Sequence, residues 1–207
     1  MPTVREYADS NGNGRCDTEG LRGLNAQIFE LLRPVVSDDL VSCEHTVNVV
    51  GPSAIPFLQP AAVRALEAAV RERGGGEMPR LNHAYRTLAH QFVLFRWGRR
   101  RVCRISLVNR PGTSTHENGI AIDLADADRW VTVLERHGWR HRGRPDPPHF
   151  TFVGRGIDPR VLTESVRAFQ RLWNLHNPTD RIGEDGVFGE RETGPRLSRS
   201  PVAGFGP

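Results

Sequence analysis

The chain has 207 residues, a length that suits one domain of ordinary size and a small appendage. Hydrophobic residues make up 38% of the chain and charged residues 25%, which is enough apolar content for a core. No run approaches the ~20 consecutive apolar residues of a membrane-spanning helix, so the composition excludes an integral membrane protein. All 28 basic residues are arginine and the formal net charge is +4, but no nucleic-acid-binding motif accompanies them, so we expect no nucleic-acid partner.

The N-terminal segment M-P-T-V-R-E lacks the apolar stretch of a secretory signal, so the route of any export stays open.

Residues 9–20 read D-S-N-G-N-G-R-C-D-T-E-G. Oxygen-bearing side chains at Asp9, Asn11, Asn13 and Asp17, with glycine at the sixth place, follow most of an EF-hand calcium loop, although its last position is also glycine. Two interpretations stay open, a structural calcium site and a glycine-rich surface turn.

Hydrophobic periodicity, glycines and prolines predict alternating short strands and helices. Helices are predicted over residues 21–33, 61–73, 88–97 and from Asp126 or Asp128 to 137, and strands over 46–50, 80–85, 102–108, 120–124 and 149–153. We expect an α+β fold with a small antiparallel sheet and flanking helices.

Five arginines gather at positions 96, 99, 100, 101 and 104. They form either a solvated face or a surface that attracts an anionic cell-wall polymer.

The three cysteines leave an odd count. Alternation over 102–108 predicts Cys103 as a buried thiol, whereas Cys16 and Cys43 could pair if the protein matures outside the cytoplasm.

The richest stretch is S-T-H-E-N-G-I-A-I-D at residues 114–123, followed downstream by D-P-P-H-F at 146–150. A catalytic zinc needs three ligands of the His, Asp and Glu kinds and an open fourth position. A turn at Gly119 and a buried strand after it can aim His116 and Asp123 at one point. His149 begins a second strand in which Phe150 and Phe152 face away from it. The sequence therefore predicts a zinc site formed by His116, Asp123 and His149.

Asp146 lies three residues before His149, and the two prolines between them stiffen the segment. Zinc lowers the pKa of a bound water to about 7, and an adjacent carboxylate can accept that proton and pass it to a leaving amine. We assign this acid/base role to Asp146.

The pattern S-x-H-x-x-G-x-A-x-D followed by D-x-x-H-F resembles the zinc D-alanyl-D-alanine carboxypeptidases. That family includes endolysins that cut L-alanyl-D-glutamate bonds, in a wider clan with hedgehog domains. The resemblance covers roughly residues 80–153 and implies a hedgehog-like fold, the three ligands above and Asp146 as acid/base, where many relatives have glutamate. It also implies a substrate-polarising Arg86 within a Y-R-T-x-x-x-Q segment, with Tyr85, Gln91 and Ser114 as substrate contacts.

Toward the C-terminus, V-R-A-F-Q at 166–170 and D-G-V-F-G at 185–189 resemble the small helical peptidoglycan-binding module. The alternative is a helical cap packed on the enzyme. The predicted organisation is an N-terminal segment over 1–40, a catalytic core over 41–155, the helical module over 156–200 and a flexible tail over 201–207.

These motifs together predict a monomeric zinc peptidase that cuts peptidoglycan stem peptides at the cell wall, in the periplasm or outside the cell. It would act as a D,D-carboxypeptidase or as an endopeptidase. The alternative from another class is a non-catalytic peptidoglycan-binding protein that keeps the fold. A serine hydrolase built on Ser114 and His116 is disfavoured because no nucleophile-elbow motif surrounds Ser114.

Overall fold

The computed structural model describes residues 1–12, 14–105 and 107–206. The chain divides into two compact units, each assembled from separate segments. The first unit comprises Met1–Val36, Thr87–Ser114 and Leu162–Pro207, and the second comprises Ser37–Arg86 and Thr115–Val161. Residues of the predicted catalytic core are therefore found in both units. No helix in the described ranges is long and apolar enough to cross a membrane.

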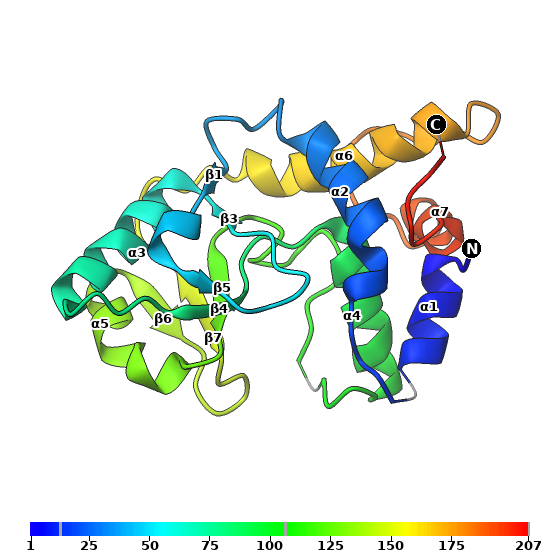
Figure 1. Cartoon of the computed structure of the whole chain (residues 1–207). Coiled ribbons are helices and arrows are strands. Elements are labelled where there is room, and N and C mark those ends of the chain that lie inside the picture. Colours follow the sequence, from blue (N-terminus) through cyan, green and yellow to red (C-terminus); the bar gives the residue numbers. More distant parts are fainter. Residues whose placement is uncertain (13, 106, 207) are drawn as a thin grey trace. The chain divides into compact units, whose positions relative to one another are not determined.

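The second unit is built on a five-stranded sheet (Figure 1). Its strands, in spatial order, are β2 (Asn48–Val49), β4 (Arg80–His83), β5 (Ala121–Leu124), β7 (His149–Phe152) and β6 (Trp139–His141). Two further short strands, β1 (Val41–Ser42) and β3 (Phe57–Leu58), pair antiparallel. With helices α3 (Pro60–Arg73) and α5 (Val131–Arg136), this arrangement confirms the predicted α+β class.

The sheet differs from the predicted antiparallel one at a single pairing. Strand β2 pairs parallel with β4, while the other neighbours in the sheet are antiparallel. The chain leaves β2, forms β3 and the long helix α3, and then enters β4. A helical crossover of this kind returns the chain to the same end of the sheet and so joins parallel strands.

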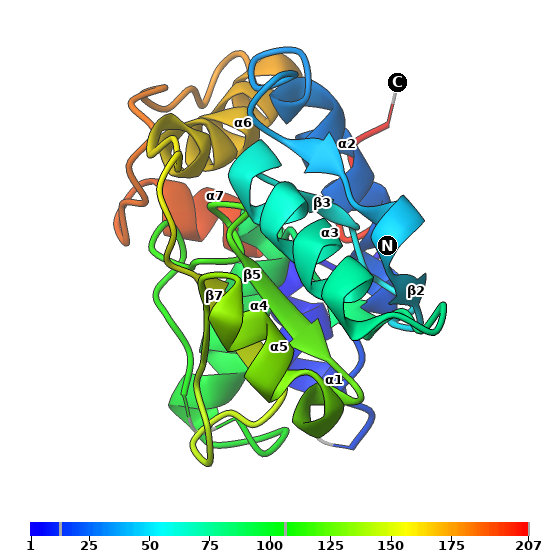
Figure 2. The same ribbon diagram turned by 90° about the vertical axis from the view of Figure 1, so that its left-hand side faces the viewer.

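Helices α3 and α5 cover one face of the sheet (Figure 2). Ile122 and Leu124 of β5, and Phe150 and Phe152 of β7, point to that face and are fully or almost fully buried in the core. Because successive side chains of a strand alternate between faces, Asp123 and His149 point to the other face. The predicted alternation over residues 149–152 is confirmed, and it separates the core from the polar site.

The first unit is mainly helical. Its helices are α1 (Val4–Asn11), α2 (Arg22–Leu32), α4 (Leu88–Arg100), most of α6 (Arg160–His176) and α7 (Thr193–Arg199). Apolar residues at helical spacing, such as Leu24, Ile28 and Leu32 of α2, are completely buried. The helices predicted over 21–33 and 88–97 are confirmed with small changes at their ends.

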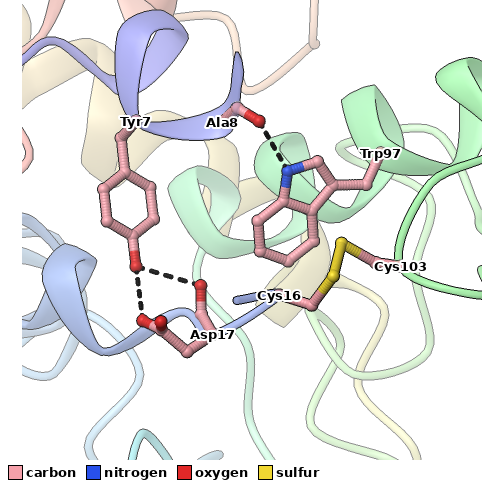
Figure 3. The surroundings of a disulfide bond; sticks show 6 residues. All are labelled: Tyr7, Ala8, Cys16, Asp17, Trp97 and Cys103. Carbon is pink, nitrogen blue, oxygen red and sulfur yellow. Dashed lines mark hydrogen bonds between the residues drawn. A yellow bond between two sulfur atoms is a disulfide. The ribbon is translucent and has the colours of Figure 1, made fainter. Parts of the chain in front are cut away.

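A disulfide joins Cys16 to Cys103 within this unit (Figure 3). The predicted buried thiol at Cys103 is therefore wrong, and the pairing of Cys16 with Cys43, which the sequence left open, does not form. Three hydrogen bonds lie beside the disulfide. The indole N–H of Trp97 donates to the Ala8 carbonyl, and the Tyr7 hydroxyl is shared between the backbone carbonyl and the carboxylate of Asp17. Cys43 is the free, buried cysteine.

The predicted strand over residues 102–108 is also wrong for its described residues; Ser106 lies outside them. Arg101, Cys103 and Arg104 have φ of 53–58°, a left-handed conformation that an extended strand does not allow. The alternating apolar residues Cys103, Ile105 and Leu107 do not share a buried face, because Leu107 is 45% exposed. Ile105 instead packs against α4 at Gly98 together with Val108, which lies outside the alternation. A Cβ at Gly98 would lie only 2.4 Å from Val108.

The predicted flexible tail makes specific contacts instead. The side-chain amide of Gln27 donates to the Phe205 carbonyl and its oxygen accepts from the Phe205 N–H, both at 2.8 Å. The Phe205 ring stacks on His176 with centroids 4.9 Å apart. Residues 201–206 are therefore part of the first unit's packing.

The disulfide spans 87 residues of sequence, so chain entropy predicts that it contributes about 4.6 kcal/mol to the free energy of unfolding. We expect dithiothreitol to lower the melting temperature of the native chain by several degrees and to leave a Cys16→Ser/Cys103→Ser variant unchanged. Thiol labelling of the denatured, unreduced chain should detect one cysteine, Cys43. Three labelled thiols, or equal melting with and without reductant, would contradict this pairing.

Candidate metal centre

Backbone pairing brings two of the predicted ligands face to face. Asp123 of β5 and His149 of β7 are direct antiparallel partners, and directly opposed residues project their side chains to the same face of a sheet. His116 comes from the turn before β5, where the Gly119 N–H bonds to the His116 carbonyl at 3.1 Å.

Gly119 is needed for this turn because its φ is +66° and a Cβ there would lie 2.5 Å from Leu40. The glycine thus helps to carry His116 toward the strands.

The three predicted ligands converge. His149 Nδ1 lies 3.0 Å from Asp123 Oδ1, His116 Nε2 lies 3.3 Å from the same oxygen, and the two imidazole nitrogens are 3.1 Å apart. Zinc bonds to nitrogen and oxygen are about 2.0–2.2 Å long, so ligand atoms at tetrahedral corners lie roughly 3.3 Å apart or slightly more. The observed triangle is close to that size, and these residues could hold a metal ion.

The outer hydrogen bonds of both imidazoles orient the rings so that their inner nitrogens could coordinate a metal ion. His116 Nδ1 is 2.7 Å from the Ala84 carbonyl; a carbonyl only accepts, so Nδ1 carries the hydrogen and Nε2 keeps its lone pair. His149 Nε2 is 2.9 Å from the Thr151 hydroxyl, a partner that lets Nδ1 keep its lone pair in the same way. Metal-binding histidines are typically oriented by such partners.

The electrostatics of the triad also suit a cation. Burial lowers the pKa of His116, and the nearby Arg86 charge adds to this effect, so the ring is neutral at pH 7. Burial alone would raise the pKa of Asp123, but His116, His149 and Arg86 hold it well below its usual range. The two imidazoles and the carboxylate therefore meet with ligand atoms directed toward one another, an arrangement that could hold a divalent cation.

Arg86 lies against the same carboxylate. Its Nη2 is 3.2 Å from Asp123 Oδ2, the oxygen that does not contact the two imidazoles closely, and its side chain is only 10% exposed. The negative charges of Glu117 and Asp146 also favour the protonated, positively charged form of the Arg86 guanidinium. The structure thus brings this predicted catalytic residue to the triad.

Asp146 is half-buried beside the triad. Its N–H bonds to the Gly143 carbonyl and its carbonyl accepts from the His149 N–H, at 3.0 and 3.1 Å. Burial raises the pKa of the Asp146 carboxyl, and the negative charge of Asp123 adds to the rise. A carboxyl with a raised pKa is better matched to proton exchange near neutral pH than an ordinary aspartate.

Sequence reasoning missed several neighbours of the triad. His83 pairs with Asp123 across β4 and β5, with Nδ1 3.8 Å from Oδ2, and Glu117 is a completely buried carboxylate next to His116. Thr151 could have been found, because period-two alternation puts it on the face of His149. His83 required the register between β4 and β5, which the sequence alone does not fix.

The predicted substrate contacts fall in different units. Tyr85 is buried in the second unit, where its N–H bonds to the Ile55 carbonyl at 3.0 Å. Gln91 and Ser114 are buried residues of the first unit, and the Gln91 amide donates to the Asn109 carbonyl at 2.8 Å. Their contacts with substrate stay predictions.

The predicted calcium ligands have other partners. Asp9 and Asn11 belong to helix α1 rather than to a loop, and the Asp9 carboxylate bonds to Arg96 and Arg100 at 2.8 and 2.9 Å. Asp17 accepts from the Tyr7 hydroxyl, and Asn13 lies outside the described residues. Because Asp9 and Asn11 are helical, the first positions of the motif do not have the backbone conformation of a calcium-binding loop. Calcium binding stays a prediction.

Comparison with known proteins adds no family assignment: no protein-family model and no curated protein matches the chain. The resemblance to zinc D-alanyl-D-alanine carboxypeptidases rests on the motifs described above.

We expect the chelator-treated chain to bind one equivalent of Zn²⁺, measured by competition with a chromophoric chelator. Loss of an outer-shell partner alone weakens metal binding about 10–100-fold, so His116→Ala, Asp123→Ala and His149→Ala should each weaken it about 100-fold or more. His45→Ala, a change at an exposed histidine paired with Glu67, is the matched control. Unchanged affinity in the three ligand variants would refute the assignment.

Acid should destabilise the metal-free chain through His83. Burial and the Arg86 charge lower the pKa of His83 to about 4 from its ordinary 6.5. Between these values the unfolded chain binds a proton that the folded chain does not, so stability is full above pH 6.5 and falls as the pH drops toward 4.

Urea denaturation of the chelated chain should therefore show a lower midpoint at pH 5 than at pH 7. The difference should be smaller in His83→Gln and unchanged in His45→Gln. A His83→Gln chain as acid-sensitive as the native one would show that His83 is not the titrating group.

Proposed function

We propose that the chain is a zinc-dependent peptidase that hydrolyses amide bonds in peptidoglycan stem peptides. The observation that carries the proposal is the juxtaposition of two chemically different sets of groups in one unit. His116, Asp123 and His149 offer three converging ligand atoms, and Asp146 is a half-buried carboxylate whose charge interacts with Asp123, His149 and Arg86. The metal would be Zn²⁺, which favours two imidazoles and one carboxylate with an open fourth position.

In this proposal each residue has a distinct task. A bound zinc ion supplies Lewis-acid activation of water and of the amide carbonyl. Asp146 accepts the proton that the attacking water loses and returns it to the nitrogen of the leaving amine. Arg86 stabilises negative charge on the carbonyl oxygen of the substrate, and its bond to Asp123 holds the guanidinium in position. Ala84 and Thr151 orient the two imidazoles.

The C-terminal motifs support peptidoglycan as the substrate by resemblance, and their residues form one local structure. The Gln170 amide donates to Asp185 Oδ1, and its oxygen accepts from the Gly186 N–H, both at 2.8 Å. Gly186 has a φ of +73°, and a Cβ there would lie 2.8 Å from the Thr163 carbonyl oxygen. The two halves of the motif therefore hold each other in place through a helix and a tight turn.

Asp146→Asn tests the proposal because it keeps the size of the side chain and removes its basicity. General acid–base catalysis contributes about 10²–10⁴-fold, so we expect cleavage of purified peptidoglycan to fall by at least two orders of magnitude. Zinc affinity should change little. Asp128→Asn, at an exposed position of the same unit, should cleave like the native chain. Mass spectrometry of the released muropeptides measures the rate and identifies the bond cut.

The outcomes separate the peptidase from its rival. Full activity in Asp146→Asn would remove Asp146 from the mechanism, and full activity in metal-stripped protein would remove zinc. A native, zinc-loaded chain that binds peptidoglycan without releasing any fragment would favour the non-catalytic binding protein.

A further inference from the structure

A cleft of about 840 Å³ lies in the first unit, among α1, α4, α7 and the loop before α7. Every residue that lines it belongs to that unit, whereas all three predicted metal ligands belong to the other. Its size is within the range of about 300–1,000 Å³ that is usual for small-molecule sites. The proposed peptidase chemistry makes no use of it.

Aromatic rings form the apolar part of the cleft. Phe92 and Phe95 project from α4 three residues apart, and Phe188 joins them from the loop before α7. The Phe92 and Phe188 ring centroids are 6.2 Å apart and the rings are tilted by 53°. Phe95 and Phe188 are partly exposed, so the ring surfaces are accessible to a flat or apolar group.

Arginines dominate the polar part. Five arginines line the cleft against two glutamates, a formal excess of three positive charges; the arginines are Arg5, Arg96, Arg99, Arg100 and Arg199. Most of them have carboxylate partners. Arg5, Arg96 and Arg100 contact Asp9, and Arg199 contacts Asp180.

Arg99 differs from the other four. In the part of the chain that the structure describes, no carboxylate pairs with it, and its guanidinium lies over the Phe95 ring at 5.9 Å from the centroid. The side chain is exposed. A guanidinium held on an aromatic face keeps its N–H donors available for an anion.

We propose that this cleft binds a phosphomonoester carried on a ring-shaped, apolar body. The planar guanidinium fork matches phosphate oxygens in a bidentate way, and a dianion offsets more of the excess positive charge than a single carboxylate does. The phenylalanine rings take the apolar body of the ligand. Binding at this site needs no metal.

Phenyl phosphate is the probe, titrated into the full-length chain by isothermal calorimetry at low ionic strength, with chelator present throughout. We expect saturable 1:1 binding of phenyl phosphate, at least about tenfold weaker binding of inorganic phosphate, and none of phenol; tenfold corresponds to ~1.4 kcal/mol. No saturable binding of phenyl phosphate would overturn the proposal. Equal affinities for phenyl phosphate and inorganic phosphate would overturn the role of the rings.

Arg99→Gln removes the unpaired charge at an exposed position where the fold is not at risk. We expect it to weaken phenyl phosphate binding about tenfold, as for loss of a charge-assisted hydrogen bond. Arg155→Gln, an exposed arginine of the second unit, changes the net charge equally and should leave binding unchanged. Equal weakening in both variants would mean a non-specific charge effect and would refute the site. Zinc binding should be native in both variants, so this test is independent of the peptidase test.

Discussion

The antiparallel pairing of β5 with β7 is the constraint on which the candidate centre depends. It sets Asp123 opposite His149 on one face of the sheet and Ile122 opposite Phe150 on the other. Packing on one face determines the geometry of the other, since burial of Ile122 and Phe150 against α3 and α5 fixes the strand register. That register brings the two predicted ligands, Asp123 and His149, together. A slip of one residue would send the ligands into the core and the aromatic side chain to the polar face. The strong apolar pattern of these strands is thus a requirement for the site as well as for stability.

Charge balance is the second constraint on the centre. One carboxylate, Asp123, serves two imidazoles through Oδ1 and Arg86 through Oδ2. Burial lowers the pKa of His116, so that ring offers a lone pair rather than positive charge. Glu117 and Asp146 add negative charge around Arg86. His116, Asp123 and His149 could hold a divalent cation, which would add positive charge next to the Asp123 carboxylate.

The sequence was most informative where local pattern decides structure. The buried strand over 120–124, the period-two strand over 149–152, the helices after Pro60 and Thr87, and the convergence of the three predicted ligands could all be predicted from the residue pattern. The disulfide could not, because it joins positions 87 residues apart and depends on left-handed backbone at both cysteines. The apolar alternation around Cys103 was misleading, since Ile105 and Val108 pack against α4 from a loop and Leu107 is exposed. His83 was missed because its place beside Asp123 comes from strand register.

Zinc K-edge X-ray absorption on the zinc-loaded chain tests the metal centre most directly. The account predicts a four-coordinate shell of nitrogen and oxygen atoms at about 2.0–2.1 Å, with the outer-shell scattering of two imidazoles, and loss of one imidazole contribution in His149→Ala. A shell that contains sulfur, or one that stays the same in His116→Ala and His149→Ala, would place the zinc elsewhere and contradict the account.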